Sequence, residues 1–465
     1  MKRPSLPLVA LCLAFSSCHG LNFGQFNQRV IPSRMRYTTP TIPVASIANT
    51  LGAGHSPLQE IFQYNQLSYN IPLGAQFENG AYDPSRNVFT GLEVTHDRIF
   101  LAVPRLYPGV PSTISYVPRA AIGVIPNPPL EPFPGWDWQS PNGLGGYSAN
   151  CSGFTSVYRI RADRCNRLWV LDSGLTNSLA GFMPVCNPKM IAFDLSTDQP
   201  VRTVVFSRSV LRPSSLLTNL AIDYEGPETD PNCERLVFYI TDTAVAGMVV
   251  YDLARDQARR VSDLSMYPDP DYGTYTIAGE SFSLMDGVIG MALSPARAPS
   301  ERLLYFQPLA TNRVFSVPTS ALRDFNAGEG QQLPVTLVGR KSSQGAGLAM
   351  DDLGILYFSP VAETAVASYS PATGQQSIIT VDNDRLQFAA ELRVDDSDGS
   401  LWLLSTRFQK YFRNTINLNE INLRVIRIPQ ELLMNSQGAV GQFGYQLGGV
   451  HNVYTRSANV SHYFA

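Results

Sequence analysis

The sequence is poor in histidine, and this shortage limits the catalytic chemistry that it can carry. It has five histidines in 465 residues, and none accompanies a Gly-x-Ser-x-Gly motif. His451 and His462 lie near the C-terminal end, while His96 precedes Asp97 in a predicted hairpin turn. A Ser-His-Asp hydrolase needs a placed histidine base, so the sequence argues against that class of enzyme.

Charged residues are also scarce, and their signs are balanced. Asp, Glu, Lys and Arg make up 16% of the chain, against about a quarter in ordinary globular domains. The 35 basic and 38 acidic residues include no basic cluster, so a nucleic-acid partner is not expected. The sequence has no phosphate-binding glycine loop and no dinucleotide motif, so no cofactor is expected either.

A short apolar run begins the chain, and no later run reaches the length of a membrane span. Lys2 and Arg3 precede the apolar stretch 6–15, and small or polar residues follow it as far as Gly20. This pattern is typical of a secretory signal peptide, which we predict at residues 1–20. The rest of the chain is expected to be secreted and extracellular, with no membrane partner.

The sequence is rich in one repeated strand pattern. A turn leads into a short apolar run of aromatic and β-branched residues, which predicts a buried strand. Six copies occur, at residues 97–104, 165–172, 233–240, 301–306, 352–358 and 398–404. Another apolar segment precedes each run, and a third follows most of them. Strand trios repeated every few tens of residues are typical of propeller blades, so we predict an all-β, six-bladed β-propeller.

The repeats place the propeller at residues 58–430. Apolar and polar residues alternate in the segment from Leu58 to Tyr69, which predicts a strand. Pairing of this strand with the last blade would close the ring. Residues 21–57 are polar and rich in proline, and we interpret them as a flexible leader. Residues 431–465 include a low-complexity stretch and are predicted to be a tail that buries little. The proline-rich segment 104–150 is expected to be a long loop over one face of the ring.

Four cysteines follow the signal peptide, and four cysteines allow three disulfide pairings. Cys151 precedes the first strand of its blade and Cys186 precedes the third, which puts both at the same end of an antiparallel sheet. Cys165 and Cys233 occupy equivalent turns of successive blades. We therefore predict the disulfides Cys151–Cys186 and Cys165–Cys233. A zinc site is the alternative, but Cys-x-x-Cys spacing and nearby histidines are both missing.

Two N-glycosylation sequons are present, Asn150-Cys151-Ser152 and Asn459-Val460-Ser461. Asn150 adjoins a cysteine of a predicted disulfide, which can hinder its modification. Asn459, in the predicted tail, is the better candidate.

The innermost strands carry charged residues of both signs. Three are acidic and two are basic: Glu93, Asp223, Glu391, Arg159 and Arg393. Mixed charge suits ion pairs or an organic ligand better than a bare divalent cation, so no metal is expected. In the proline-rich loop, Trp136-Asp137-Trp138 could form an aromatic wall for a ligand, or could pin the loop to the propeller.

These segments resemble the yellow and major royal jelly protein family of arthropods. The longest shared motif runs from Asp163 to Gly174 (DRCNRLWVLDSG). The other matching segments are 97–100, 104–105, 109–113, 136–138, 193–195, 286–295, 304–309, 401–407 and 421–426. The resemblance covers residues 58–430 in order and implies a secreted, six-bladed propeller.

The resemblance also implies a range of functions. Family members serve in cuticle pigmentation, eggshell, royal jelly and saliva; some bind serotonin and catecholamines in the central channel, and others convert dopachrome. We therefore expect a secreted protein of cuticle, eggshell or pigmentation biology, with a small aromatic amine or catechol as possible ligand. The alternatives are a dopachrome-converting enzyme and a purely structural matrix protein. With no histidine placed for acid–base work, a non-catalytic role is favoured, and the oligomeric state stays open.

Ligand contacts can be proposed from the last blade. In amine-binding relatives some contacts come from motifs like 405–407 and 422–424, so the resemblance implies that Thr406 and Asn422 hydrogen-bond the ligand. Capping of strand ends is the alternative role for both. Many relatives have Phe in place of Leu423, and the loss of that ring would weaken stacking. From its charge and position, Glu391 is our candidate for the counter-ion of the amine.

Overall fold

The apolar repeats fold into six antiparallel sheets of four strands each. The protein is described by a computed structural model that covers residues 56–140, 144–145, 147–225, 232–296, 301–328 and 330–434. These residues all belong to the larger of two units of the chain, Ile42–Ala465. The predicted signal peptide, nearly all of the leader, most of the tail and Asn459 lie outside the described residues.

Each sheet is one blade, whose strands run in order from the innermost to the outermost. Blade 1 holds β2 (Gly91–Val94), β3 (Arg98–Ala102), β4 (Ile114–Pro118) and β5 (Glu131–Pro132), and blade 2 holds β6 (Val157–Ala162), β7 (Arg167–Asp172), β10 (Lys189–Asp194) and β11 (Gln199–Val205). Blade 3 holds β12 (Leu217–Tyr224), β13 (Leu236–Asp242), β14 (Gly247–Asp252) and β15 (Gln257–Val261), and blade 4 holds β18 (Val288–Leu293), β19 (Leu303–Pro308), β20 (Arg313–Pro318) and β21 (Thr336–Arg340). Blade 5 holds β22 (Leu348–Met350), β23 (Leu356–Phe358), β24 (Ala365–Ser370) and β25 (Gln375–Val381), and blade 6 holds β26 (Ala389–Val394), β27 (Leu401–Ser405), β28 (Leu423–Ile428) and β1 (Gln59–Tyr64).

Short elements connect these strands. Two hairpins lie outside the blades: β8 (Leu175–Thr176) with β9 (Met183–Pro184), and β16 (Thr274–Ile277) with β17 (Glu280–Ser283). The α-helices are α2 (Trp136–Gln139), α3 (Thr319–Leu322) and α4 (Phe408–Arg413). The 3-10 helices are η1 (Pro84–Arg86), η2 (Arg119–Ala121), η3 (Leu264–Met266) and η4 (Pro270–Tyr272). None of the helices formed by the described residues has the length and apolar character needed to cross a bilayer.

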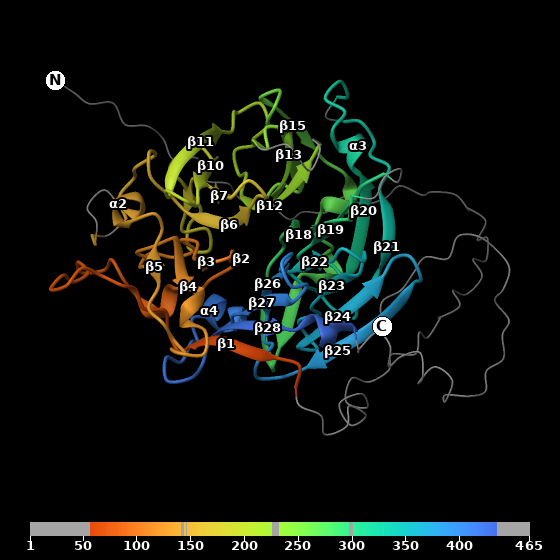
Figure 1. The fold of residues 1–465 in the computed structure, drawn as a ribbon. Coiled ribbons are helices and arrows are strands. Elements are labelled where there is room, and N and C mark those ends of the chain that lie inside the picture. The colour runs from red at the N-terminus through yellow and green to blue at the C-terminus, as the bar shows by residue number, and fades with distance from the viewer. Residues whose placement is uncertain are drawn as a thin grey trace, which may run out of the picture. The chain divides into compact units, whose positions relative to one another are not determined.

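The innermost strands of the six blades surround one axis (Figure 1). Each of them contacts its two neighbours in the order β2, β6, β12, β18, β22, β26 and back to β2. The predicted six-bladed β-propeller is therefore confirmed. The strand that closes the ring is also as predicted: β1 pairs antiparallel with β28, from Gln59 opposite Arg427 to Tyr64 opposite Leu423.

The strands are buried on both faces because each blade packs between two others. All five residues of β3 and all seven of β13 are buried. This is why the strands appear in the sequence as continuous apolar runs rather than as alternating ones. The largest apolar cluster includes residues from every blade or its flanking loop: Leu92, Tyr158, Leu216, Leu309, Val361 and Leu404.

The longer insertions gather on one face of the ring, which we call the loop face. Successive turns of an antiparallel sheet lie at alternate ends, so connections between second and third strands share a face with connections between blades. The loop face therefore carries the hairpins β8–β9 and β16–β17 and the helix α4. Every innermost strand begins at this face and ends at the opposite one.

Both disulfides join the cysteines that hairpin geometry pairs. Cys151 and Cys186 have their Cα atoms 5.5 Å apart and link the loops before β6 and β10. Cys165 and Cys233 have Cα atoms 6.1 Å apart and link a turn of blade 2 to the loop before β13 of blade 3. The second bond therefore fastens two neighbouring blades to each other.

The proline-rich loop is held to the ring by a buried arginine. Arg105 donates hydrogen bonds to five backbone carbonyls, those of Val110, Pro111, Gln139, Phe154 and Thr155. Within the same loop, the ring of Trp138 lies 5.2 Å from that of Phe154 and 5.1 Å from that of Phe193. Trp138 thus pins the loop to blade 2, which is one of the two roles considered for the Trp-Asp-Trp motif.

We predict that the closing strand contributes strongly to stability. The Phe62 side chain on β1 is buried, so Phe62→Ala should lower the free energy of unfolding by about 3–5 kcal/mol. Gln59→Ala, at an exposed position of the same strand, should change it by less than about 0.5 kcal/mol. Urea unfolding of both variants is the measurement, and equal small losses would show that ring closure does not depend on β1 packing.

Candidate functional site

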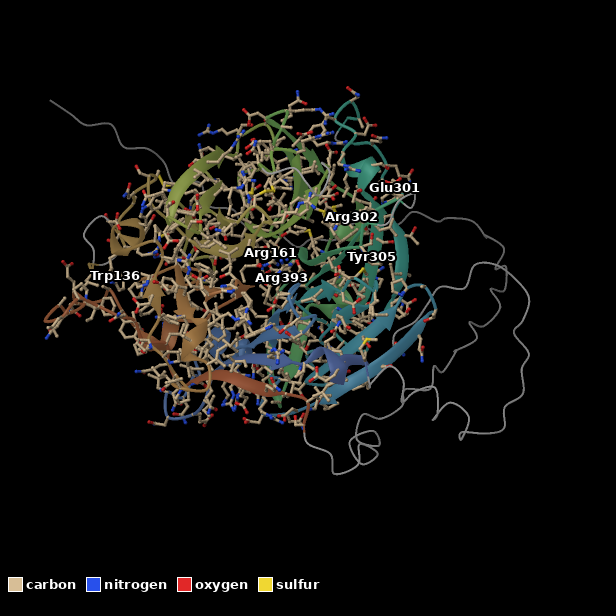
Figure 2. The ribbon with its side chains drawn as sticks, viewed as in Figure 1. Trp136, Arg161, Glu301, Arg302, Tyr305 and Arg393 are labelled. Carbon is tan, nitrogen blue, oxygen red and sulfur yellow. A yellow bond between two sulfur atoms is a disulfide. The ribbon has the colours of Figure 1, made fainter. Side chains whose placement is uncertain are left out.

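Five charged side chains meet around the axis of the ring. They come from three innermost strands: Glu93 from β2, Arg159 and Arg161 from β6, Glu391 and Arg393 from β26. We call them the axial cluster. Figure 2 shows Arg161 and Arg393 near the middle of the ring and Trp136 at its edge, so Trp136 forms no wall for an axial ligand. Four of the five are buried, and Arg393 is partly exposed.

Glu391 is held by two guanidinium groups of blade 2. Its carboxylate forms an ion pair with Arg159 and lies 2.8 Å (Oε1) from Nη2 of Arg161. Arg159 also donates to the carbonyl of Thr90, and Arg161 donates to the side chain of Asn219 at 3.3 Å. The negative charge of Glu391 is thus already balanced within the protein. An amine would have to compete with two arginines for this carboxylate.

Glu93 completes the axial cluster. Its Oε2 lies 3.1 Å from Nε of Arg393 and 3.9 Å from Nη1 of Arg161. Burial raises the pKa of Glu93, while the charges of Arg393 and Arg161 oppose that rise. Burial lowers the pKa of Arg159 to about 9 and that of Arg161 well below its ordinary value. Buried charges of this kind are tolerated only when they are paired, which explains why both signs occur on the innermost strands.

Asp223, the third acidic residue predicted on an innermost strand, lies apart from this cluster. Its Oδ1 is 2.6 Å from Nη1 of Arg302, and its Oδ2 accepts a hydrogen bond of 2.9 Å from the hydroxyl of Tyr239. Arg302 precedes β19 in blade 4, so Asp223 ties two neighbouring blades together.

Thr406, Asn422 and Leu423 are buried in blade 6, where they contact its backbone and core. The hydroxyl of Thr406 donates to the carbonyl of Phe388 at 3.4 Å. The amide of Asn422 donates to the carbonyls of Asn65 and Asn417, both at 2.8 Å. These bonds match the capping role considered for the two residues. Oδ1 of Asn422 is buried and has no hydrogen bond within the described residues, so it retains an acceptor.

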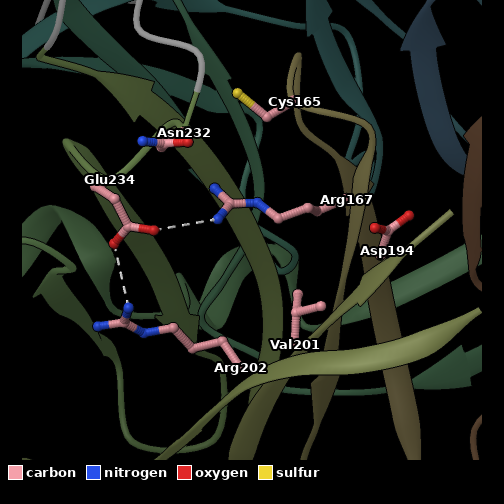
Figure 3. A pocket seen from close by; sticks show the side chains of 7 residues that line it. All are labelled: Cys165, Arg167, Asp194, Val201, Arg202, Asn232 and Glu234. Carbon is pink, nitrogen blue, oxygen red and sulfur yellow. Dashed lines mark hydrogen bonds and ion pairs between the residues drawn. The ribbon is translucent and has the colours of Figure 1, made fainter. Parts of the chain in front are cut away.

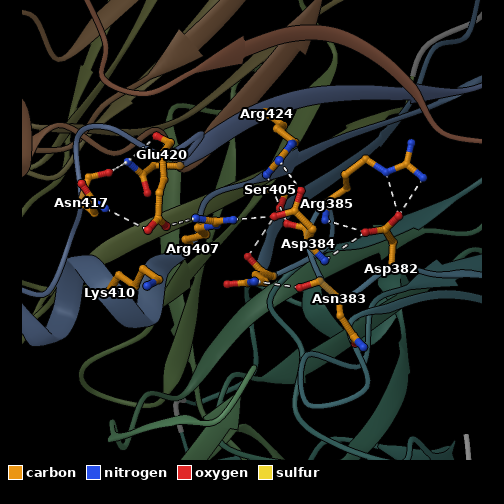
Figure 4. Close-up of polar contacts among 12 residues, drawn as sticks. Asp382, Asn383, Asp384, Arg385, Ser405, Arg407, Lys410, Asn417, Glu420 and Arg424 are labelled. Atoms are coloured by element: carbon orange, nitrogen blue, oxygen red, sulfur yellow. Dashed lines mark hydrogen bonds and ion pairs between the residues drawn. The ribbon is translucent and has the colours of Figure 1, made fainter. Parts of the chain in front are cut away.

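An ionic network surrounds the ends of these strands (Figure 4). The carboxylate of Asp384 lies 2.5 Å from the guanidinium group of Arg407 and 2.7 Å from that of Arg424. Arg407 also lies 2.8 Å from Glu420, and Arg424 lies 3.1 Å from Glu60 on β1. The network links β1, the loop before β26 and the end of β27. Its ion pairs fasten the closing blade.

One acidic residue that sequence analysis did not single out has a different environment. Asp286 comes two residues before β18, at the loop-face end of an innermost strand. It is half-buried, and no hydrogen bond or ion pair joins its carboxylate to any residue that the structure describes. Burial raises its pKa from the ordinary value to about 7. The charge of Asp286 in turn contributes to the raised pKa values of Tyr158 and Tyr275.

The hairpin β16–β17 covers this part of the loop face. It leaves the ring between blades 3 and 4 and reaches α4 of blade 6. The ring of Phe282 stacks on that of Tyr275 at 4.8 Å and lies 4.9 Å from that of Phe412. At the tip, Glu280 lies 3.0 Å from Lys410. Asp286 comes three residues after β17, and its charge acts on the hydroxyl of Tyr275, a member of this aromatic cluster.

A surface groove lies beside the disulfide that joins blades 2 and 3 (Figure 3). It is lined by Cys165, Arg167, Asp194, Val201, Arg202, Asn232 and Glu234. Glu234 lies 3.7 Å from Arg167 and 3.2 Å from Arg202, so the charges of the groove are largely neutralised. Among the described residues, one group resembles a metal-binding cluster, Asp163 with Cys165 and Cys233. Its two sulfurs are joined in a disulfide and cannot serve as thiolate ligands.

The fold and the site define a class of protein: a six-bladed propeller with ion pairs along its axis and an aromatic cover at one end. The family profile described as major royal jelly protein matches residues 155–438. The chain belongs to the yellow/major royal jelly protein family, which confirms the resemblance found in the sequence.

Individual relatives match over most of the chain. Dopaminechrome tautomerase of Drosophila melanogaster is 28% identical over 396 residues, which cover 80% of this chain and 82% of that protein. Protein yellow of Drosophila yakuba is 31% identical over 395 residues, which cover 82% of this chain and 70% of that protein. Among solved structures, virginiamycin B lyase from Staphylococcus aureus is 11% identical, with a TM-score of 0.38 over 74% of this chain and 80% of that one.

The axial cluster predicts a large stability effect for Glu391. Glu391→Gln leaves the guanidinium groups of Arg159 and Arg161 buried without their main counter-charge, so the free energy of unfolding should fall by about 3–5 kcal/mol. Glu60→Gln, which removes a more exposed partner of Arg424, should cost less than about 1 kcal/mol. Urea unfolding at neutral pH compares the two, and a Glu391 variant as stable as the Glu60 variant would contradict this role.

Proposed function

We propose that this chain is a secreted protein of pigmentation, cuticle or eggshell biology that binds a small aromatic amine or catechol at the loop-face end of the propeller axis. Membership of the yellow/major royal jelly protein family supports this proposal. So does the similarity to a protein named for its action on dopaminechrome, a quinone derived from a catecholamine. Fold alone does not decide function, so the proposal rests on the chemistry of the site.

The observation that carries the proposal is the carboxylate of Asp286, which has no ionic partner among the described residues and whose charge acts on the phenols of Tyr158 and Tyr275. A cationic amine needs an anionic acceptor, and its aromatic ring needs an apolar slot. Asp286 supplies the first, and the rings of Tyr158, Tyr275 and Phe282 belong to the apolar cluster that supplies the second. A cation–π contact with one of these rings would add about 0.5–2 kcal/mol in a desolvated site.

Asp286 is a better counter-ion than Glu391, the residue proposed from sequence. The Glu391 carboxylate is bound by two arginines, whereas that of Asp286 has no ionic partner among the described residues. Thr406 and Asn422 remain candidates for ligand contact through the hydroxyl and the free Oδ1 acceptor. Leu423 is fully buried in the core, so it would support the site from behind and contribute no stacking surface.

Secretion is part of the proposal. The chain has two disulfides. Disulfides persist in oxidising compartments and are rare in the cytosol. The signal-peptide pattern at residues 1–20 supports export. Asn150 would be a glycan acceptor next to the Cys151–Cys186 disulfide, and Asn459 would be the second one.

Calorimetric titration with dopamine, serotonin and octopamine tests the binding proposal. We expect one-to-one binding in the micromolar range, and Asp286→Asn should weaken it by about tenfold or more because a charged hydrogen bond is lost. A cationic amine binds the deprotonated carboxylate. With the pKa of Asp286 near 7, affinity should therefore rise about tenfold from pH 6 to pH 8 and then level off.

Asp271→Asn is the matched control, because Asp271 lies in the same insertion and is exposed. This variant should bind like the unmodified protein. If none of the three amines gives a heat of binding, the structural matrix role would be favoured instead. Binding that does not change with pH or in the Asp286 variant would move the site away from Asp286.

A further inference from the structure

We propose that the hairpin β16–β17 is a hinged cover of the loop face, which must open before a ligand can reach the aromatic rings on its inner side. This inference rests on the proposed function, because it concerns access to the same site. It adds to that function the movement that controls entry and exit of the ligand.

The inner side of the hairpin is part of the wall that a ligand would contact. Tyr275, Ile277 and Phe282 alternate along the two strands with exposed Thr and Ser side chains. All three are buried, and they belong to the apolar cluster that includes residues from every blade or its flanking loop. Tyr275 and Phe282 are also two of the rings assigned to the amine. Because both rings are buried, a ligand reaches them only if the hairpin moves.

The base of the hairpin is fixed to blade 4. The backbone of Ala310, which follows β19, accepts a hydrogen bond from the amide of Asp269 at 2.7 Å and donates one to the carbonyl of Asp286 at 3.2 Å. These two residues precede and follow the hairpin, so a single residue of blade 4 holds both of its ends. Asp269 also lies 2.6 Å from Nη2 of Arg313 on β20. The side chain of Gln344 donates to two backbone carbonyls at the start of the hairpin, both at 2.8 Å.

The polar contacts of the tip, in contrast, lie near the surface and join the hairpin to blade 6. Glu280 lies 3.0 Å from Nζ of Lys410 on α4 and accepts a hydrogen bond of 3.1 Å from the hydroxyl of Thr415. Arg413 donates to the carbonyl of Ser281 at 3.0 Å. Ion pairs that water can reach contribute little to stability. These contacts should therefore break more readily than those of the base.

The apolar contact of the tip comes from Phe282, whose ring lies 4.9 Å from that of Phe412 and 6.1 Å from that of Phe408 on α4. The strands β16 and β17 form a two-stranded sheet separate from the blades. A two-stranded hairpin has only marginal stability of its own in water, and segments of this kind open locally while the rest of the protein stays folded. The hairpin should open about its base, where the bonds to blade 4 are retained.

A hinged cover predicts how ligand kinetics respond to the tip contacts. Weaker tip contacts destabilise the closed position equally with and without the ligand, so opening becomes more frequent in both states. The rate constants of association and dissociation should therefore rise together, while Kd stays nearly unchanged.

Hydrogen exchange of the full chain without any ligand tests the movement itself. We expect the amides of residues 275–282 to exchange at least about a hundredfold faster than those of the buried strand β13. Glu280→Gln should raise the exchange rate of the hairpin about two- to fivefold and leave that of β13 unchanged. Glu234→Gln is the matched control, because Glu234 pairs with Arg202 at the opposite face and should not affect the hairpin. A hairpin that exchanges as slowly as β13 would overturn the proposal.

Rapid mixing with dopamine tests whether opening controls access. In Glu280→Gln both rate constants should rise about two- to fivefold, with Kd within about twofold of the unmodified value. Glu234→Gln should leave both rate constants unchanged. Faster exchange of the hairpin without any change in these rate constants would show that the ligand enters by another route.

Covalent closure of the tip gives a second test of access. Lys410 is partly exposed, whereas the other two lysines of the described residues, Lys189 and Lys341, are buried. A carbodiimide should therefore join Nζ of Lys410 to the nearby carboxylate of Glu280 as an amide, while the reagent takes up the elements of water and becomes a urea. Peptide mass spectrometry identifies this cross-link.

The cross-linked chain should fail to bind dopamine, because its hairpin cannot open. Glu280→Gln treated with the same reagent should still bind, since its tip has no carboxylate to join to Lys410. Binding of dopamine by the cross-linked chain at the unmodified rate would overturn the hinged cover.

The outcomes also separate this inference from the proposed function. Dopamine binding together with a slowly exchanging hairpin would overturn the hinged cover and leave the binding function standing. Fast exchange of the hairpin without any dopamine binding would remove the proposed function and still support the hinged movement, because exchange is measured without a ligand.

Discussion

The packing of the innermost strands around the axis depends on buried ion pairs. A six-bladed ring brings its innermost strands close together, so charged side chains on three different blades meet there: Glu93, Arg159, Arg161, Glu391 and Arg393. None of these charges could be buried alone, because the cost of removing an ion from water is repaid only by close partners. Together they connect blades 1, 2 and 6, the region where the first and last blades meet.

The loop-face end holds an aromatic cluster and a carboxylate that has no ionic partner among the described residues. Asp286 and the hydroxyl of Tyr275 each lack a partner among the described residues. Groups of this kind reduce stability, and natural proteins retain them where they serve a function. The axial cluster shows the contrast, because the same fold gives Glu391 two arginine partners and gives Asp286 none within the part of the chain that the structure describes. A difference in partners, and not in burial alone, separates a structural carboxylate from a candidate functional one.

The sequence predicted the fold well because a propeller repeats one local pattern. The six apolar runs marked the blades, the segment after Leu58 marked the closing strand, and equivalent positions in neighbouring blades indicated how Cys165 and Cys233 pair. The site was harder to predict because its contacts join residues far apart in the chain. Arg161 and Glu391 are 230 positions apart, and no periodicity indicates that they meet, so Glu391 looked like a free counter-ion. Asp286 was missed because it lies in a loop, and its raised pKa comes from burial that only the three-dimensional structure reveals.

An amine bound at Asp286 would change the carboxylate itself. A bound ammonium group pairs with the carboxylate and lowers its pKa, because a nearby opposite charge favours the ionised form. Burial, which raises the pKa of Asp286, and pairing with the amine, which would lower it, therefore oppose each other, and their balance sets how strongly an amine is held near neutral pH. The ligand would then do for Asp286 what the two arginines of blade 2 do for Glu391.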